Sequence, residues 1–170
     1  MKKLFPHCLK FGLYLFLLPL LLAVSCLKQE GEEAVPVDLF GKWSLVTIGY
    51  TDKADLPPPQ DTHVWVEFSK ERPTSGQHLA GDYTYWLNGQ AAPNHYFGGF
   101  RTSGLGSEGS IRTGELATTE IASTRMMDTA FEREYFRLLP QAKSYTIQGN
   151  TLTVLCREGE KLVYNRQLPE

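Results

Sequence analysis

The chain has 170 residues, with 17 lysines and arginines against 19 aspartates and glutamates, so its formal net charge is −2 at pH 7. No run of lysines or arginines occurs in it. This argues against nucleic acid as a partner, because such binding depends on neutralising phosphates. The length suits one domain with a core of its own.

The first 25 residues have the pattern of a removable signal peptide. Three lysines and no acidic residue precede an apolar run over 13–24, which is shorter than the roughly 20 residues that a membrane-spanning helix needs. The segment 20–26 ends in Ser25 and Cys26 and resembles a bacterial lipobox. It predicts cleavage before Cys26, acylation of the Cys26 thiol and attachment to a membrane through lipid. The alternative is an uncleaved signal anchor.

Residues 26–36 are polar and acidic without periodicity, which predicts a flexible tether. Leu27, rather than aspartate, follows the cysteine, and this is similar to Gram-negative lipoproteins of the outer membrane. The acidic stretch also resembles surface-export signals, so both faces of that membrane stay open. Cleavage would remove three lysines and leave a mature chain with a net charge near −5.

Residues 37–170 show short β-type segments separated by turn residues, a pattern typical of an antiparallel barrel or sandwich. Strands are expected over 42–50, 64–68, 82–87, 96–102, 110–116, 120–123, 144–148, 151–156 and 161–167. Tight turns are expected at Asn88-Gly89, Gly149-Asn150 and Glu158-Gly159. Cys156 falls in an apolar strand, and Thr153, Val154 and Leu155 before it offer no base, so we expect a buried, unreactive thiol.

One helix interrupts the strands. Asp128 or Thr129 is expected to cap it, with Glu132 completing a capping box, and Pro140 is expected to end it. The apolar face of this helix is formed by Phe131, Tyr135 and Leu138. The sequence therefore predicts a mainly β, α+β domain in which a single helix packs on the sheet.

No motif for catalysis or for a cofactor stands in a supporting context. The segment 104–109 matches G-x-G-x-x-G, but a strand-like segment follows it instead of a helix, so it indicates a loop. His63, His78 and His95 are too far apart in sequence to suggest a metal site. We therefore expect a non-enzymatic protein without metal or cofactor.

The segment 121–128 lies just before the helix. Arg125 in it has two readings: a contact for a ligand or partner, or a tie that holds the loop through carbonyls or a carboxylate, and the second is favoured. Met126 and Met127 are expected to be adaptable core residues.

Several segments in order carry a family resemblance. They are 41–43 with Gly-Lys-Trp, 94–100 with its Asn-His-Tyr start, 121–127, the helix, and the hairpin over 145–154. Together they resemble the META domain of heat-shock-inducible bacterial outer-membrane lipoproteins. The resemblance implies a small, partly open antiparallel β-barrel of about eight strands with one inserted α-helix. It implies no settled activity, only connections with stress response, antibiotic tolerance, secretion and motility.

Two departures from the family pattern fall together. Relatives commonly have a cysteine before the asparagine, where this chain has Pro93, and another after the methionine pair, where it has Asp128. If those cysteines pair in relatives, the resemblance implies that the loops around 93 and 128 touch.

The leading functional hypothesis is a lipid-anchored envelope protein that supports the envelope under stress or binds an envelope partner there. Its candidate surface comprises Asn94, Tyr96 and Arg125. The alternative is a lipocalin-like carrier of a small apolar ligand, which the Gly-x-Trp start also resembles. In that case the barrel cavity would be lined by Tyr83, Tyr85, Trp86, Tyr96, Phe97 and Phe100. A filled interior with an exposed apolar patch would favour partner binding.

Overall fold

The computed structural model describes residues 38–71, 83–104 and 106–168. They belong to one compact unit, Val35–Glu170. The predicted signal peptide, Cys26 and the tether over 26–36 lie outside the described residues. Within the described part, no helix is long and apolar enough to span a membrane.

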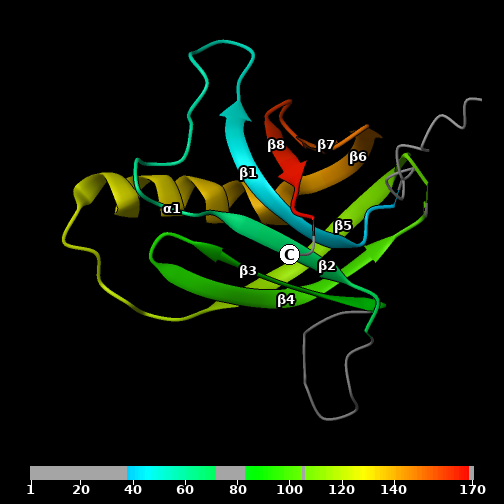
Figure 1. The fold of residues 1–170 in the computed structure, drawn as a ribbon, viewed down its shortest axis with the longest axis horizontal. Coiled ribbons are helices and arrows are strands. Elements are labelled where there is room, and N and C mark those ends of the chain that lie inside the picture. The colour runs from blue at the N-terminus through cyan, green and yellow to red at the C-terminus, as the bar shows by residue number, and fades with distance from the viewer. Residues whose placement is uncertain (1–37, 72–82, 105, 169–170) are drawn as a thin grey trace, which may run out of the picture. The chain divides into compact units, whose positions relative to one another are not determined.

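Eight antiparallel strands form a closed ring in chain order, and β1 pairs with β8 to complete it (Figure 1). The strands are β1 (Gly41–Gly49), β2 (Trp65–Ser69), β3 (Tyr85–Ala91), β4 (Asn94–Thr102), β5 (Glu108–Thr118), β6 (Ala142–Gln148), β7 (Thr151–Cys156) and β8 (Lys161–Arg166). Closure pairs every strand with two neighbours. The predicted mainly β antiparallel barrel of about eight strands with one helix is confirmed.

The barrel is closed rather than partly open, but one junction is narrow. Only three residue pairs join β5 to β6, Glu108–Thr146 through Ser110–Ser144. Beyond this junction, α1 (Met126–Leu138) and the 3-10 turn η2 (Leu139–Gln141) connect the two strands. Thr113 on β5 donates a hydrogen bond of 2.9 Å to the Leu139 carbonyl, so η2 closes the place where strand pairing stops.

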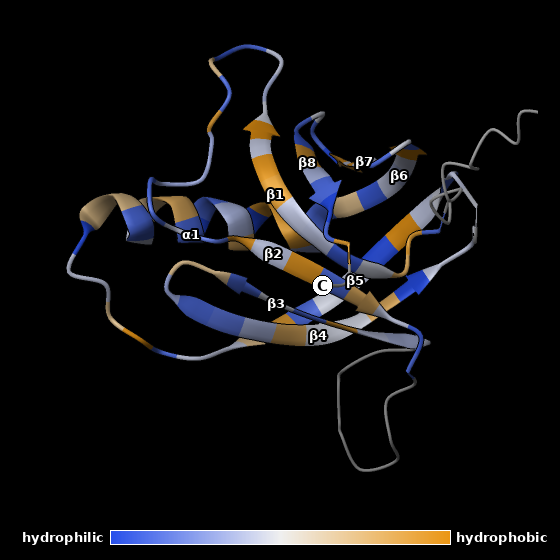
Figure 2. Cartoon of the chain, viewed as in Figure 1, coloured by the Kyte–Doolittle hydropathy of each residue, from blue (hydrophilic) through white to orange (hydrophobic). Residues whose placement is uncertain are grey.

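The barrel interior is filled by large side chains. Buried positions alternate with more exposed ones along β2 and β7 and along much of β1, and Figure 2 shows apolar bands between polar ones on β1 and β5. The helix adds its own apolar face, because Phe131, Tyr135 and Leu138 are at most 3% exposed and belong to the same core. The largest fully buried side chains are Trp43, Tyr96, Tyr135, Tyr145, Tyr164, Phe68 and Phe100.

The predicted turn at Asn88-Gly89 is wrong, since both residues lie within β3 and the turn to β4 is formed by Ala92 and Pro93. Position 89 needs glycine for a packing reason, because a Cβ there would overlap the Trp65 carbonyl and the ring of Tyr96. The sequence alone does not distinguish a glycine required for this close approach within a sheet from a glycine required in a turn. The expected strand over 120–123 is also wrong, because that segment is irregular.

The helix begins earlier than predicted. Arg125 is its N-terminal cap residue and makes no side-chain capping bond, so the predicted capping box at Thr129 does not form. Asp128 lies in the first turn instead, is 6% exposed and accepts a hydrogen bond of 3.0 Å from the Ser123 hydroxyl. A carboxylate there favours the helix through its dipole. Pro140 falls in η2, directly after the helix, as expected.

The close approach at Gly89 can be tested by substitution. Gly89→Ala is expected to lower the free energy of unfolding by about 1–3 kcal/mol, because the added methyl group must displace either the Trp65 backbone or the Tyr96 ring. Urea unfolding measures this difference. Gly106→Ala is the matched control, since a Cβ at Gly106 has no atom within 4 Å. Equal stability of the two variants would contradict the packing argument.

Candidate functional site

Tyr96 lies inside the barrel and not on a surface. It is 2% exposed, and its hydroxyl donates to the Trp65 carbonyl at 3.1 Å. The Tyr135 hydroxyl is 2.7 Å from that of Tyr96 and 3.1 Å from that of Tyr164. Because the carbonyl can only accept, Tyr135 donates to Tyr96 and Tyr164 donates to Tyr135. The predicted surface role of Tyr96 is therefore wrong: it is part of a chain of hydroxyls across the core.

Burial keeps these three hydroxyls protonated. It raises the pKa of Tyr135 to about 12, and it holds the pKa of Tyr96 and of Tyr164 well above the ordinary value for tyrosine. A hydroxyl with such a pKa remains a hydrogen-bond donor at neutral pH. The chain from Tyr164 to Trp65 is thus a structural network and offers no acid or base near pH 7.

The six aromatic residues proposed to line a ligand cavity do not surround a common space. Neighbouring residues of a strand point to opposite faces, so Tyr96 is buried while Phe97 is 50% exposed. On the outside Phe97 packs edge-on against Trp86, with ring centroids 5.9 Å apart. Tyr83 covers Gly99 and Gly114, where a Cβ would contact its ring. The aromatics are divided between core and outer surface.

Asn94 is also buried, at 7% exposure, and it organises the backbone around it. Its Oδ1 accepts from the Ile121 backbone N–H at 2.6 Å and from the Thr119 hydroxyl at 2.9 Å, and its Nδ2 donates to the Ile121 carbonyl at 3.2 Å. Its own backbone N–H donates to Glu132 at 3.1 Å. Asn94 therefore holds the start of β4 against the segment between β5 and α1, and it is not available to a partner.

The bonds of Asn94 bear on the expected approach of the loops at 93 and 128. Asn94 directly follows Pro93, and its partners Ile121 and Glu132 stand on either side of Asp128 in the chain. These bonds join the residue after Pro93 to residues on both sides of Asp128, and direct contact between the loops at 93 and 128 stays a prediction.

Arg125 is the one predicted site residue with an accessible side chain, at 47% exposure. One of its terminal nitrogens donates to the Gln60 carbonyl at 2.7 Å, and its Nε lies 3.4 Å from the Asp128 carboxylate. A carbonyl and a carboxylate are the partners expected of a loop tie. Arg125 therefore joins the β1–β2 loop to the start of α1.

Exposed apolar residues that the sequence did not predict lie on both sides of Arg125 in the chain. Met126 is 89% exposed, Met127 71% and Ile121 53%, and we call these three residues the connector patch. The expectation that the methionines fill the core is wrong. The first turn of α1 extends beyond the strands in Figure 1, and Met127 is largely exposed there although it lies four residues before buried Phe131.

The Cys156 thiol and the Glu134 carboxylate belong to reactive types, but their surroundings make both groups unreactive. Burial raises the pKa of Cys156 to about 12, and its thiol donates to the Leu138 carbonyl at 3.5 Å, which confirms the buried thiol. Arg137 bridges Glu134 and Glu160 at 2.9 Å each. It holds the pKa of Glu134 at about 2, so this carboxylate stays ionised and paired.

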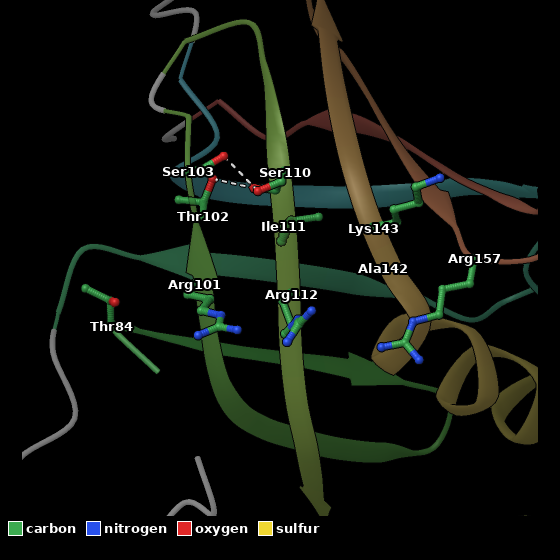
Figure 3. Close-up of a pocket in the computed structure, with 10 residues that line it drawn as sticks. All are labelled: Thr84, Arg101, Thr102, Ser103, Ser110, Ile111, Arg112, Ala142, Lys143 and Arg157. Carbon is green, nitrogen blue, oxygen red and sulfur yellow. Dashed lines mark hydrogen bonds between the residues drawn. The ribbon is translucent and has the colours of Figure 1, made fainter. Parts of the chain in front are cut away.

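Metal-ligating residues do not gather in residues 38–71, 83–104 and 106–168: no group of three or more His, Cys, Asp or Glu could hold an ion there. One cluster of charged side chains in this part of the chain is basic. A pocket of about 380 Å³ on the outside of the barrel has four cationic side chains in its lining, and we call it the basic pocket. Its cations are Arg101, Arg112, Lys143 and Arg157, which come from β4, β5, β6 and the turn after β7 (Figure 3).

Sequence reasoning missed the basic pocket, although one signal was present. Arg101 and Arg112 lie in the two predicted strands, 96–102 and 110–116, on either side of the predicted loop over 104–109, and they are partners in the β4–β5 register. Nothing in the sequence indicated that Lys143 and Arg157 would lie near them, because the register of β6 and β7 with respect to β5 is set only when the barrel closes.

The role of Asn94 can be tested directly. Asn94→Ala is expected to lower the free energy of unfolding by about 1–3 kcal/mol, because it leaves the Ile121 N–H and C=O without their partner. Faster hydrogen exchange at the Ile121 amide should accompany the loss. Asn88→Ala is the control, since Asn88 makes one long bond of 3.4 Å to Glu67, and it should change stability by less than about 0.5 kcal/mol. Unchanged exchange at Ile121 would contradict the assignment.

Comparisons with known proteins place this geometry in a family. A solution structure of a protein from Burkholderia xenovorans superposes with a TM-score of 0.58 at 19% sequence identity, covering 78% of this chain and 85% of that chain, which shows a common fold. No curated protein matches the chain. The family model of the META domain matches residues 38–168, the whole barrel with its helix. The chain belongs to the META domain family.

Proposed function

We propose that this chain is a lipid-anchored, non-enzymatic protein of the bacterial cell envelope that acts by binding on the outside of its barrel. The observation that carries this proposal is the filled interior. Trp43, Tyr96 and Tyr164 are among side chains with at most 2% exposure that occupy the space where a lipocalin-like carrier would hold its cargo. Binding is therefore assigned to the outer surface.

The chemistry of the described residues supports a binding role over a catalytic one. Cys156 is buried with a raised pKa, and the carboxylates of Glu134 and Glu160 are both paired with Arg137. A general acid or base needs a pKa near the working pH and access to a substrate, and these groups lack both.

The connector patch supports an envelope protein as the partner. Exposed methionine is flexible and polarizable, and surfaces that adapt to a partner use it often. Arg125 beside the patch ties the segment to the Gln60 carbonyl, so the methionines are presented on an anchored turn. A role in envelope maintenance under stress is what the META resemblance implies, and such a role is compatible with a binding protein.

The lipid anchor would leave the barrel free to reach such a partner. Eleven residues separate Cys26 from Asp38, and a fully extended chain of that length spans at most about 40 Å. Attachment at Cys26 in the outer membrane, on either face, would keep the domain within that distance of the lipid surface.

Metabolic labelling with palmitate tests the anchor. The full chain should incorporate label and sediment with membranes, whereas Cys26→Ser should do neither, because the acylated thiol is gone. Cys8→Ser is the matched control, since Cys8 lies in the signal peptide, and it should label normally. Label retained by the Cys26 variant would contradict the lipobox assignment.

Native mass spectrometry tests the filled interior. Residues 26–170, produced without lipid and incubated with the uncharged fraction of an envelope lipid extract, are expected to show only the mass of the free protein. A retained apolar molecule at defined stoichiometry would contradict the proposal and establish the carrier function instead.

A further inference from the structure

The basic pocket is an unusual feature on this chain. The mature protein is expected to be acidic, near −5, yet Arg101, Arg112, Lys143 and Arg157 meet around one hollow of about 380 Å³. Figure 3 shows Arg101 and Arg112 side by side on β4 and β5, with Arg157 extending toward Arg112 and the Lys143 side chain on β6 directed away from the arginines. A general excess of positive charge therefore cannot account for the cluster.

The arrangement costs stability in the free protein. Arg101 and Arg112 are directly opposite each other in the β4–β5 register, and like charges at such positions repel. The five ion pairs found among the described residues involve none of the four cations of the pocket. An anion placed between the cations would remove the repulsion, and no carboxylate of the described chain does so.

Irregular backbone directs the other two cations to the pocket. The β6–β7 register shifts between Ala142 and Ser144, so Lys143 is the extra residue of a bulge. Bulges re-aim side chains, and they recur beside functional sites. Arg157 directly follows Cys156, the partner of Ala142 across the same strands, so it emerges next to Lys143.

Hydroxyl groups complete the lining. Thr84, Thr102, Ser103 and Ser110 all border the pocket. The hydroxyls of Ser103 and Ser110 are 2.7 Å apart, and in such a pair one oxygen accepts while its own proton stays free to donate elsewhere. The pocket thus combines charged and neutral donors without any acidic group among its lining residues.

From this geometry we propose that the basic pocket binds a ligand carrying phosphate groups. Guanidinium groups match phosphate oxygens with two parallel hydrogen bonds, and phosphates concentrate negative charge in a small volume. A single carboxylate would neutralise only one of four cations, whereas a diphosphate or a phosphoester neutralises more. The volume is within the range of small-molecule sites. This site is independent of the lipid anchor and of the connector patch.

Two sources share this chemistry: a soluble phosphoester and the headgroup of an anionic phospholipid. The test uses residues 35–170, because this compact unit contains the closed barrel and its whole described core. Inorganic pyrophosphate is titrated at low salt by calorimetry and by amide chemical shifts. We expect one site per chain, with shift changes centred on Arg101, Arg112, Lys143 and Arg157.

The decisive variant is the double substitution Arg101→Gln and Arg112→Gln. It should weaken pyrophosphate binding at least 10-fold, and its Tm without ligand should equal or exceed that of the wild type, because a repulsive pair is removed. Arg133→Gln is the control, because it makes the same arginine-to-glutamine change at an exposed residue of α1 that does not line the pocket. It should bind pyrophosphate as the wild type does.

Vesicles distinguish the two sources. Cosedimentation with phosphatidylglycerol but not phosphatidylcholine vesicles, lost in the double variant, would assign the site to a lipid headgroup. Pyrophosphate binding without cosedimentation would assign it to a soluble phosphoester, and either result supports the site. No binding of pyrophosphate at millimolar concentration, or equal weakening by Arg133→Gln, would overturn the proposal without affecting the lipid anchor or the filled barrel.

Discussion

The hydrogen bond between Tyr135 of α1 and Tyr96 of β4 is the interaction on which the rest of this structure depends. It joins the only helix of the described chain to the inside of the barrel, and Tyr164 on β8 extends it to the far side. A small barrel must be filled to be stable, and here the helix supplies part of the filling. Gly89 lacks a side chain so that the Tyr96 ring can lie against β3.

A filled interior is the reason for proposing that binding occurs on the outer surface. That surface has two features with different chemistry: the apolar connector patch at the start of α1, and the basic pocket across β4, β5 and β6. The buried polar groups have largely found partners inside the protein, as Asn94 does with Ile121 and Thr119. The four cations of the basic pocket, by contrast, take part in none of the ion pairs among the described residues.

Local patterns predicted most elements correctly. The β-type composition of short segments between turn residues located β1, β2, β4 and β5 to within a few residues, and glycine located the hairpin turn at Gly149, where φ is +57°. The local sequence pattern gave wrong predictions where a residue's environment depends on residues far away in the chain. The sequence predicted a turn at Gly89, but the glycine instead leaves room for the Tyr96 ring across the sheet. It predicted a core position for Met126, but the helix begins beyond the barrel and Met126 is exposed.

By itself the sequence determined the fold class, the family resemblance, the helix with its apolar face and the predicted lipid attachment at Cys26, because these depend on spacing along the chain. Only the tertiary structure decided that Asn94 and Tyr96 are internal and that Arg101, Arg112, Lys143 and Arg157 meet. The physical reason is register: which residues face each other across a closed barrel depends on strand pairing and bulges, and a shift of one residue would reverse every side chain.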